Sequence, residues 1–203
     1  MEWFIGDTHF GHGNIIRYCH RPFASVDEMD ATIIQNINSR LGRGDILYHV
    51  GDWSFRNADK FRDRIDCPNI HFIMGNHDKD RALYERIFTT VRDLNKITIK
   101  RDGKKYQIVL CHYAMRVWNK SHHGAWHLYG HSHNTLPDDP NSLSFDVGVD
   151  AIAQRAIGMS RDDDLALWAD QLSPDDYRPI SLDEVEALME SKAYKPKDHH
   201  GDR

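Results

Sequence analysis

The chain has 203 residues, of which 40% are hydrophobic, and this size and composition favour one compact domain over residues 1–203. Its formal net charge is −5, which argues against an extended basic surface for a nucleic-acid backbone, although a local site for an anionic substrate stays compatible with it. The three cysteines contain no CxxC pair, which argues against a disulfide framework or a zinc ribbon, and free thiols favour a reducing compartment.

The two ends of the chain give further expectations. Residues 1–7 carry no basic stretch and no apolar run of signal-peptide length, and no segment approaches the roughly 20 apolar residues that cross a bilayer. We therefore expect a soluble, cytoplasmic protein with no membrane partner. The acidic segment 151–203 is expected to be mostly helical or irregular from Asp162 onward, with the last ten residues disordered.

The first half of the chain predicts three strand–loop–helix units. Apolar runs at 3–5, 46–50 and 70–74 predict buried strands, each of which ends in Gly-Asp or Gly-Asn. Ser25 and Glu28 form a capping-box pattern before a helix expected over 26–41, and further helices are expected over 57–66 and 79–88. Successive units of this kind imply parallel strands with right-handed crossovers, and ligands usually bind beyond the carboxyl ends of such strands.

The second half changes character. Strands over 97–99 and 106–110 flank an Asp102-Gly103 pair that suits a hairpin turn. Further strands are expected over 126–130 and 144–149. The run 162–164, three aspartates, is expected as a solvated helix start. The acidic stretch 151–178 either covers a surface or mediates self-association, and the sequence does not choose between the two.

Five short polar segments, each after a predicted strand, carry the chemistry. They are Asp7-Thr8-His9, Gly51-Asp52, Gly75-Asn76-His77-Asp78, Cys111-His112 and Gly130-His131-Ser132-His133. Together they offer two carboxylates, one amide oxygen and four histidines as direct ligands. In Asp-x-His and His-x-His an extended backbone would place both side chains on one face. Oxygen and nitrogen donors without thiolates suit manganese, iron, cobalt, nickel or zinc in a site that is not structural zinc.

This series in this order, D-x-H, GD, GNHD, H and GHxH, resembles the calcineurin-like metallophosphoesterase superfamily over residues 7 to 133. Residues 145–150 are similar to the strand that closes many of its members. The opening motif over 7–16 is similar to a subgroup of small phosphoesterases found in bacteria and their phages. The resemblance implies an α/β fold, a four-layer α-β-β-α sandwich of two mixed β-sheets flanked by helices.

The resemblance also implies two divalent metal ions, manganese first, with iron, zinc, nickel or cobalt as alternatives. One ion would be bound by Asp7, His9 and His133, and the other by Asn76, His112 and His131. Asp52 would bridge the two ions, and a hydroxide shared by them would attack the phosphorus of a phosphodiester or a phosphomonoester. His77 would assist the leaving group, and Asp78 would hold the His77 ring or support the ligands.

Residues outside the motifs leave alternatives open. His12 and Asn14 either line the phosphate site or only shape their loop. The segment 115–124 links two ligand-bearing strands and either overhangs the site or forms a partly ordered surface loop. In the first case Arg116, His122 and His123 would grip the leaving group, and Trp118 would offer a stacking surface for a base.

Three functions remain in competition. The first is a phosphoesterase, with diester preferred to monoester, acting on a small phosphate ester or nucleotide-like substrate. The second is a nuclease that processes nucleic-acid ends, which the overall charge does not favour. A local supply of basic residues exists at Lys100, Arg101, Lys104, Lys105, Arg116 and Lys120. The third is a metal-binding interaction protein without turnover, which the complete ligand set disfavours. The oligomeric state stays open.

Overall fold

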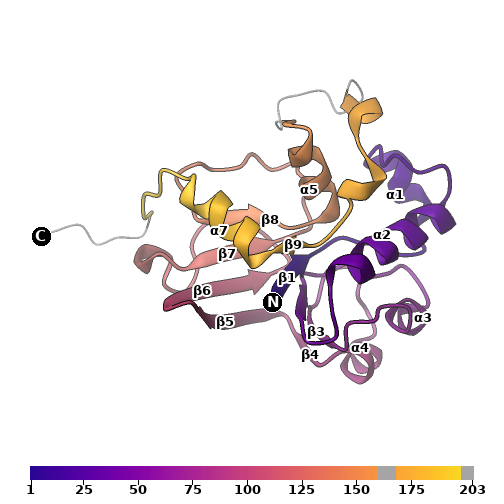
Figure 1. Cartoon of the computed structure of the whole chain (residues 1–203), viewed down its shortest axis with the longest axis horizontal. Coiled ribbons are helices and arrows are strands. Elements are labelled where there is room, and N and C mark those ends of the chain that lie inside the picture. The colour runs from indigo at the N-terminus through magenta and orange to yellow at the C-terminus, as the bar shows by residue number, and fades with distance from the viewer. Residues whose placement is uncertain (160–167, 198–203) are drawn as a thin grey trace, which may run out of the picture.

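The computed structural model describes residues 1–159 and 168–197, and its strands form two mixed sheets (Figure 1). The first sheet has the order β4 (Thr90–Arg92), β3 (Asn69–Ile73), β2 (Ile46–His49), β1 (Glu2–Ile5) and β9 (Ile180–Ser181). The second has the order β5 (Leu94–Arg101), β6 (Lys104–Cys111), β7 (Trp126–Tyr129) and β8 (Ser144–Asp146). The predicted α/β fold with two mixed sheets is confirmed.

The first sheet follows the predicted succession of units. Strands β1 to β4 are parallel, and only β9 runs antiparallel, against β1. Its outer face is covered by α1 (Gly13–Tyr18), α2 (Val26–Arg40), α3 (Ala58–Arg62) and α4 (Arg81–Ile87). The predicted cap of α2 is present, because the Ser25 hydroxyl accepts a hydrogen bond from the Glu28 amide.

Alternation along the strands builds two cores. Ile5, Leu47 and Phe72 point outward into a core with the helices. Their neighbours Phe4 and Tyr48 point the other way, into a core that lies between the two sheets. On the second sheet, the residues that face this inner core include Ile108, Leu110, Leu128 and Phe145.

Other segments close the sandwich. The segment 113–125, with the short helix η1 (Ser121–His123), covers the outer face of the second sheet, where the Trp118 ring packs 5.2 Å from the His127 ring. Helix α7 (Leu182–Glu190) lies against the β5–β6 hairpin, and the Tyr106 hydroxyl donates to Glu186 at 2.9 Å. The hairpin tip precedes β6 and His112 follows it, so the tip and the ligand loops lie at opposite ends of this strand.

Several sequence predictions were wrong in their details. The strand expected over 144–149 ends at Asp146, and helix α5 (Val149–Ala156) begins directly afterwards. The change occurs because Gly148 forms a bridge with Gly6 and the Val149 amide bonds to the Gly6 carbonyl, which ties the chain to the first sheet. The helix expected over 57–66 is only the short α3.

The C-terminal segment holds further short elements. It contains η2 (Ala169–Gln171), η3 (Pro174–Asp176) and the unexpected strand β9. Of the last ten residues, 194–197 are described, and the Lys195 amide donates to the Asn141 carbonyl at 2.8 Å, whereas 198–203 lie outside the described residues. The aspartates at 162–164 lie outside the described residues. No described helix combines the length and apolarity that crossing a bilayer requires.

Candidate metal centre

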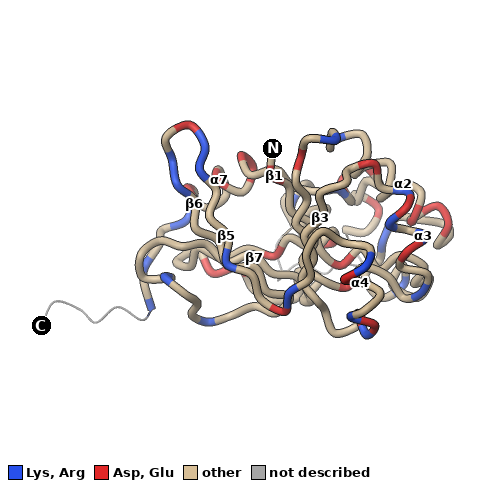
Figure 2. Tube along the Cα trace, turned by 90° about the horizontal axis from the view of Figure 1, so that it is seen from below, with Lys and Arg blue, Asp and Glu red and all other residues tan. Residues whose placement is uncertain are grey.

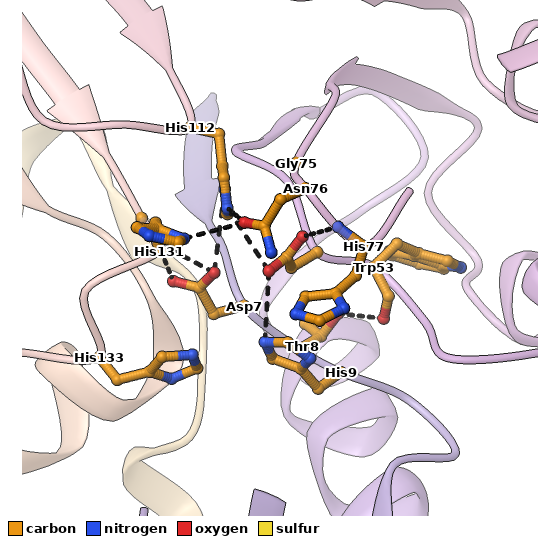
Figure 3. A network of polar contacts seen from close by, with 12 residues as sticks. Asp7, Thr8, His9, Trp53, Gly75, Asn76, His77, His112, His131 and His133 are labelled. Atoms are coloured by element: carbon orange, nitrogen blue, oxygen red, sulfur yellow. Dashed lines mark hydrogen bonds and ion pairs between the residues drawn. The ribbon is translucent and has the colours of Figure 1, made fainter. Parts of the chain in front are cut away.

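The five polar segments meet at one end of the sandwich, in the loops that follow β1, β2, β3, β6 and β7 (Figure 3). Parallel strands bring their carboxyl ends to the same edge, so both sheets present their loops there. Close approach requires glycine at two of these turns. A Cβ on Gly51, whose φ is +89°, would lie 2.4 Å from His112 Nδ1, and a Cβ on Gly75 would lie 2.2 Å from Asp52 Oδ1.

The ligand residues do not use the extended backbone that the sequence analysis expected. Asp7 and His9 have φ values of 53° and 51°, and His131 and His133 have values of 68° and 45°. The loops keep their hydrogen bonds, because the Asp7 amide donates to the Gly51 carbonyl and the His9 amide to the Asp52 carbonyl, both at 3.0 Å. Their side chains nevertheless converge on one cluster.

Asp7, His9 and His133 form the first group of donors. Their ligand atoms lie within 4.8 Å of one another. His9 Nε2 is buried and has no hydrogen-bond partner among the described residues, and burial lowers the pKa of this ring, which keeps it neutral. A neutral imidazole whose buried Nε2 has no hydrogen-bond partner and lies beside carboxylates is suited to bind a cation.

Asp52, His112 and His131 form the second group, again within 4.8 Å. The Asn76 amide oxygen joins them, at 3.0 Å from His112 Nε2 and 2.9 Å from His131 Nδ1. The other ring nitrogen of His112 donates to the Val50 carbonyl at 2.9 Å, so Nε2 is the atom presented to the cluster.

Asp52 lies between the two groups. Its Oδ2 is 3.6 Å from His9 Nε2 and 3.4 Å from His112 Nε2. Although burial disfavours the charged carboxylate, the hydrogen bond and charge of His112 hold the pKa of Asp52 below its usual value. A carboxylate that reaches both groups has the position of a bridging ligand.

The buried carboxylates of the cluster favour positive charge beside them. Burial raises the pKa of Asp7 to about 7. Burial also opposes the charged form of His112, but the hydrogen bond to Asp52 and the charges of Asp7 and Asp52 raise its pKa to about 9. The neighbouring carboxylates of Asp7 and Asp52 thus favour positive charge on His112. The mixed oxygen and nitrogen donors fit divalent first-row metals.

Two buried charged residues, Asp150 and Arg21, orient the His133 ring, and neither was among the site residues predicted from the sequence. His133 Nδ1 lies 2.6 Å from Asp150 Oδ2, which leaves Nε2 for the cluster. Arg21 donates to both Asp150 oxygens, at 2.8 and 2.7 Å, and also to the carbonyls of Asp7 and Thr8. Despite the cost of burial, Arg21 and His133 hold the pKa of Asp150 below its usual value. Asp150 ends the 145–150 motif, but no local signal marked Arg21.

The Asp78 carboxylate accepts four hydrogen bonds. It accepts from the amides of Asp52 (2.7 Å), Trp53 (3.1 Å) and Gly75 (2.8 Å), and from the Tyr84 hydroxyl (2.7 Å). These bonds hold the loops that carry Asp52 and Asn76. Of the two roles expected for Asp78, its contacts correspond to support of the ligands, since no described hydrogen bond joins it to the His77 ring.

His77 lies at the edge of the cluster. Its amide donates to Asp52 Oδ1 at 2.9 Å, and its exposed ring lies 5.5 Å from the His9 ring and 5.9 Å from the Phe55 ring. Two exposed aromatic residues near the ligands were missed by the sequence analysis. Phe55 is one, and Tyr113 is the other, with its ring 4.7 Å from that of His131. Isolated aromatic residues after a strand carry no motif.

The candidate substrate contacts divide into two sets. His12 lies beside the cluster, with its ring 5.5 Å from that of His9, and Asn14 is exposed in the first turn of α1. Trp118 is buried and its indole donates to the Ala125 carbonyl at 2.8 Å, so it does not present a stacking surface. The remaining candidates, Arg116, His122 and His123, are exposed on the segment that covers the outer face of the second sheet.

Comparison with solved structures finds a shared fold. The protein of unknown function AQ665 from Aquifex aeolicus superposes with a TM-score of 0.61 at 24% identity, covering 93% of this chain and 98% of that chain. A conserved uncharacterized protein from Streptococcus pneumoniae, described as a predicted phosphoesterase, gives a TM-score of 0.39 at 14% identity over 75% of this chain and 73% of that one. A TM-score this low leaves the second match without bearing on function.

Sequence comparison places the chain among known proteins more firmly. No family model matches it. The uncharacterized protein MJ1445 of Methanocaldococcus jannaschii is 32% identical over 197 residues, which cover 93% of this chain and 90% of that protein. The chain therefore belongs to the same protein family as MJ1445.

Proposed function

We propose that the chain is a calcineurin-like metallophosphoesterase that uses two divalent metal ions to hydrolyse phosphodiester bonds. The observation that carries the proposal is the convergence of both donor groups on Asp52, within 3.6 Å of His9 and 3.4 Å of His112. The order of the motifs, from D-x-H to GHxH, supports it. Manganese is the first candidate, and iron, zinc, nickel and cobalt accept the same donors. The three free cysteines support a reducing, cytoplasmic location.

Two divalent ions at such a centre supply a nucleophile from water at neutral pH and neutralise charge on the phosphoryl oxygens. The residues of the chain hold and orient the reacting groups. The bond from the His77 amide to Asp52 fixes the base of the His77 side chain, while its ring stays exposed beside the cluster. From this position the imidazole can donate a proton to the leaving oxygen, as a general acid.

A small substrate is favoured over nucleic acid by the position of the basic residues. Those at the tip of the β5–β6 hairpin (blue in Figure 2) lie at the opposite end of β6 from His112. An eight-residue strand separates the two ends by about 27 Å. Arg101 and Lys104 are moreover paired with Asp183 and Glu186 of α7. The basic residues of the hairpin tip are therefore remote from the metal centre, and two of them are paired with carboxylates.

The proposal is tested by adding metal back to stripped protein. Manganese, nickel, zinc or magnesium would be supplied with bis(p-nitrophenyl) phosphate and with p-nitrophenyl phosphate. We expect manganese to restore turnover, with the diester cleaved faster than the monoester. Asp52→Asn should abolish turnover together with metal binding, because it removes the shared carboxylate. His77→Ala should lower kcat by about 10²- to 10⁴-fold while two ions stay bound.

His123→Ala is the matched control, because it removes an exposed histidine that precedes β7, whereas the ligand His131 follows the other end of that strand. Its kcat should stay within about twofold of the unmodified protein. Absence of turnover with every metal, although two ions are bound per chain, would contradict the general phosphoesterase. That outcome would favour the metal-binding interaction protein.

A further inference from the structure

A hollow of about 200 Å³ opens beside His77, between the loop after β2 and the first turn of α4. Phe55 and Arg56 line it from the first of these segments, and Lys79 and Asp80 line it from the second. His77 forms part of its wall. The hollow therefore adjoins the side of the metal centre from which His77 would protonate a leaving group.

Phe55 presents a flat, fixed surface to this region. Its ring is 54% exposed, although it follows the fully buried Trp53 by only two residues. It stacks on the His12 ring at 4.3 Å with an angle of 11° between the planes. The Phe55 amide donates to the Phe10 carbonyl at 2.9 Å, which holds the backbone in place. An aromatic ring held rigidly in water is expected to gain stability by covering a planar ligand.

The charged residues at the rim of the hollow differ in whether other residues already bind them. Within residues 1–159 and 168–197, neither Arg56 nor Lys79 forms an ion pair. The Asp80 carboxylate, in contrast, already accepts a hydrogen bond from the Leu83 amide at 3.1 Å and so caps α4. The hollow therefore offers two free cations to an anionic substrate, which supports electrostatic attraction of phosphate groups.

We propose that this hollow binds the base of a nucleotide substrate, with the ring stacked on Phe55 and the phosphate charge attracted by Arg56 and Lys79. Its volume is below the about 300–1,000 Å³ typical of sites that enclose a whole drug-sized ligand, so it suits one ring system whose phosphate lies over the metal centre. This inference rests on the proposed function for the direction of cleavage, but base binding itself does not.

In the reaction, the bond between phosphorus and the nucleoside oxygen breaks, and a new bond forms between phosphorus and the oxygen of water. His77 gives its proton to the departing nucleoside oxygen, and the proton lost by the attacking water goes to solvent, from which His77 is protonated again. The products are the nucleoside alcohol and the phosphate that carries the remaining substituent. No oxidation or reduction takes place.

The test measures binding apart from turnover. The probes are the phosphonate analogue of AMP, in which a CH2 group replaces the ester oxygen, and the matching analogue of ribose 5-phosphate. Calorimetry on the manganese-loaded protein should show the adenine-bearing analogue binding at least about 5-fold more tightly, as one stacked base predicts. Phe55→Ala should remove this difference, and Phe55→Trp should keep it.

Tyr18→Ala is the matched control, because its ring is 59% exposed and lies outside the hollow. It should leave the preference unchanged. Equal binding of the two analogues, or a preference that survives Phe55→Ala, would overturn the inference. Turnover of bis(p-nitrophenyl) phosphate is measured in parallel. Turnover without a base preference refutes the hollow alone, while a Phe55-dependent preference without turnover refutes only the phosphoesterase.

Discussion

Five expected ligands hold their backbone in the left-handed region, which non-glycine residues avoid. They are Asp7, His9, Asp52, His131 and His133, with φ between 45° and 68°. Such conformations cost of the order of 1–3 kcal/mol each and persist only where the surrounding structure enforces them. For Asp7, His9 and Asp52 that enforcement comes from the hydrogen bonds between the two loops after β1 and β2 and from the Asp78 carboxylate, and the His131 amide is held by the Asp7 carboxylate. The backbone hydrogen bonds thus fix the positions of the donors.

At the scale of single residues, we expect Asp150 to strengthen metal binding at the His133 site. Asp150→Asn should weaken metal binding at the His133 site by about 10- to 100-fold, because the carboxylate that orients the ring and raises its basicity is lost. Calorimetric titration of the stripped protein with manganese would measure the change. Asp183→Asn, which alters a carboxylate on α7 far from the centre, is the matched control. Equal affinities for Asp150→Asn and the unmodified protein would contradict the orienting role.

The ligands could be proposed from the sequence because each belongs to a motif of two to four neighbouring residues. Arg21, Asp146 and Phe55 could not. Asp146 orders the loop of His131 by accepting from the Ser132 hydroxyl at 3.0 Å, and Arg21 reaches Asp150 across 129 positions of the chain. Such partners are set by tertiary packing, which no local pattern encodes.

At the scale of elements, a buried histidine joins β7 to its neighbours. His127 Nδ1 donates to the Val109 carbonyl of β6 at 3.0 Å, and Nε2 accepts from the Met115 amide at 3.1 Å. These two bonds require the neutral ring and attach the segment 113–125 to the second sheet. Burial lowers the pKa of His127 to about 4.

This arrangement predicts a pH dependence of stability. Above pH 6.5 the His127 ring is neutral in both the folded and the unfolded chain, so its full contribution to the free energy of unfolding is present. Between pH 6.5 and 4 the unfolded chain binds a proton that the folded chain does not, and the free energy of unfolding falls by about 3 kcal/mol. His127→Gln should lose this part of the slope, whereas His123→Gln should retain it. Urea unfolding at pH 7.5, 5.5 and 4.5 measures it, and parallel slopes for both variants would refute it.

Elements with strong local signals could be predicted, and those decided by distant contacts could not. The cap at Ser25 and the periodic apolar residues of α2 gave nearly the observed bounds, and Asp102-Gly103 placed the hairpin turn. Strand β9 has two residues, too few for any periodicity, and exists because it pairs with Trp3 and Phe4. The start of α5 is likewise set by the bridge between Gly6 and Gly148.

For the whole molecule, the candidate centre joins the two sheets. Asp7, His9, Asp52 and Asn76 come from loops of the first sheet, whereas the remaining ligands follow strands of the second. Cations bound there would hold the halves of the sandwich together and offset the repulsion between buried carboxylates.

Metal removal should therefore destabilise the whole fold. At a free manganese concentration 1,000 times the Kd, one bound ion adds about 4 kcal/mol to the free energy of unfolding. For a chain of this length the melting temperature should rise on the order of 10 °C over that of the stripped protein. Calorimetric melting with and without manganese measures the shift. Asp52→Asn should show little of it, and identical melting of the two forms of the unmodified protein would contradict the link.

The hairpin at the far end of β6 has a practical consequence. Gly103 lies at its tip with φ +77°, and a Cβ there would meet no atom within 4 Å. A linker or fluorophore inserted at this turn would project into solvent about 27 Å from His112. A protein tethered to a sensor surface through residue 103 would present its candidate ligand loops to the solution, in one uniform orientation.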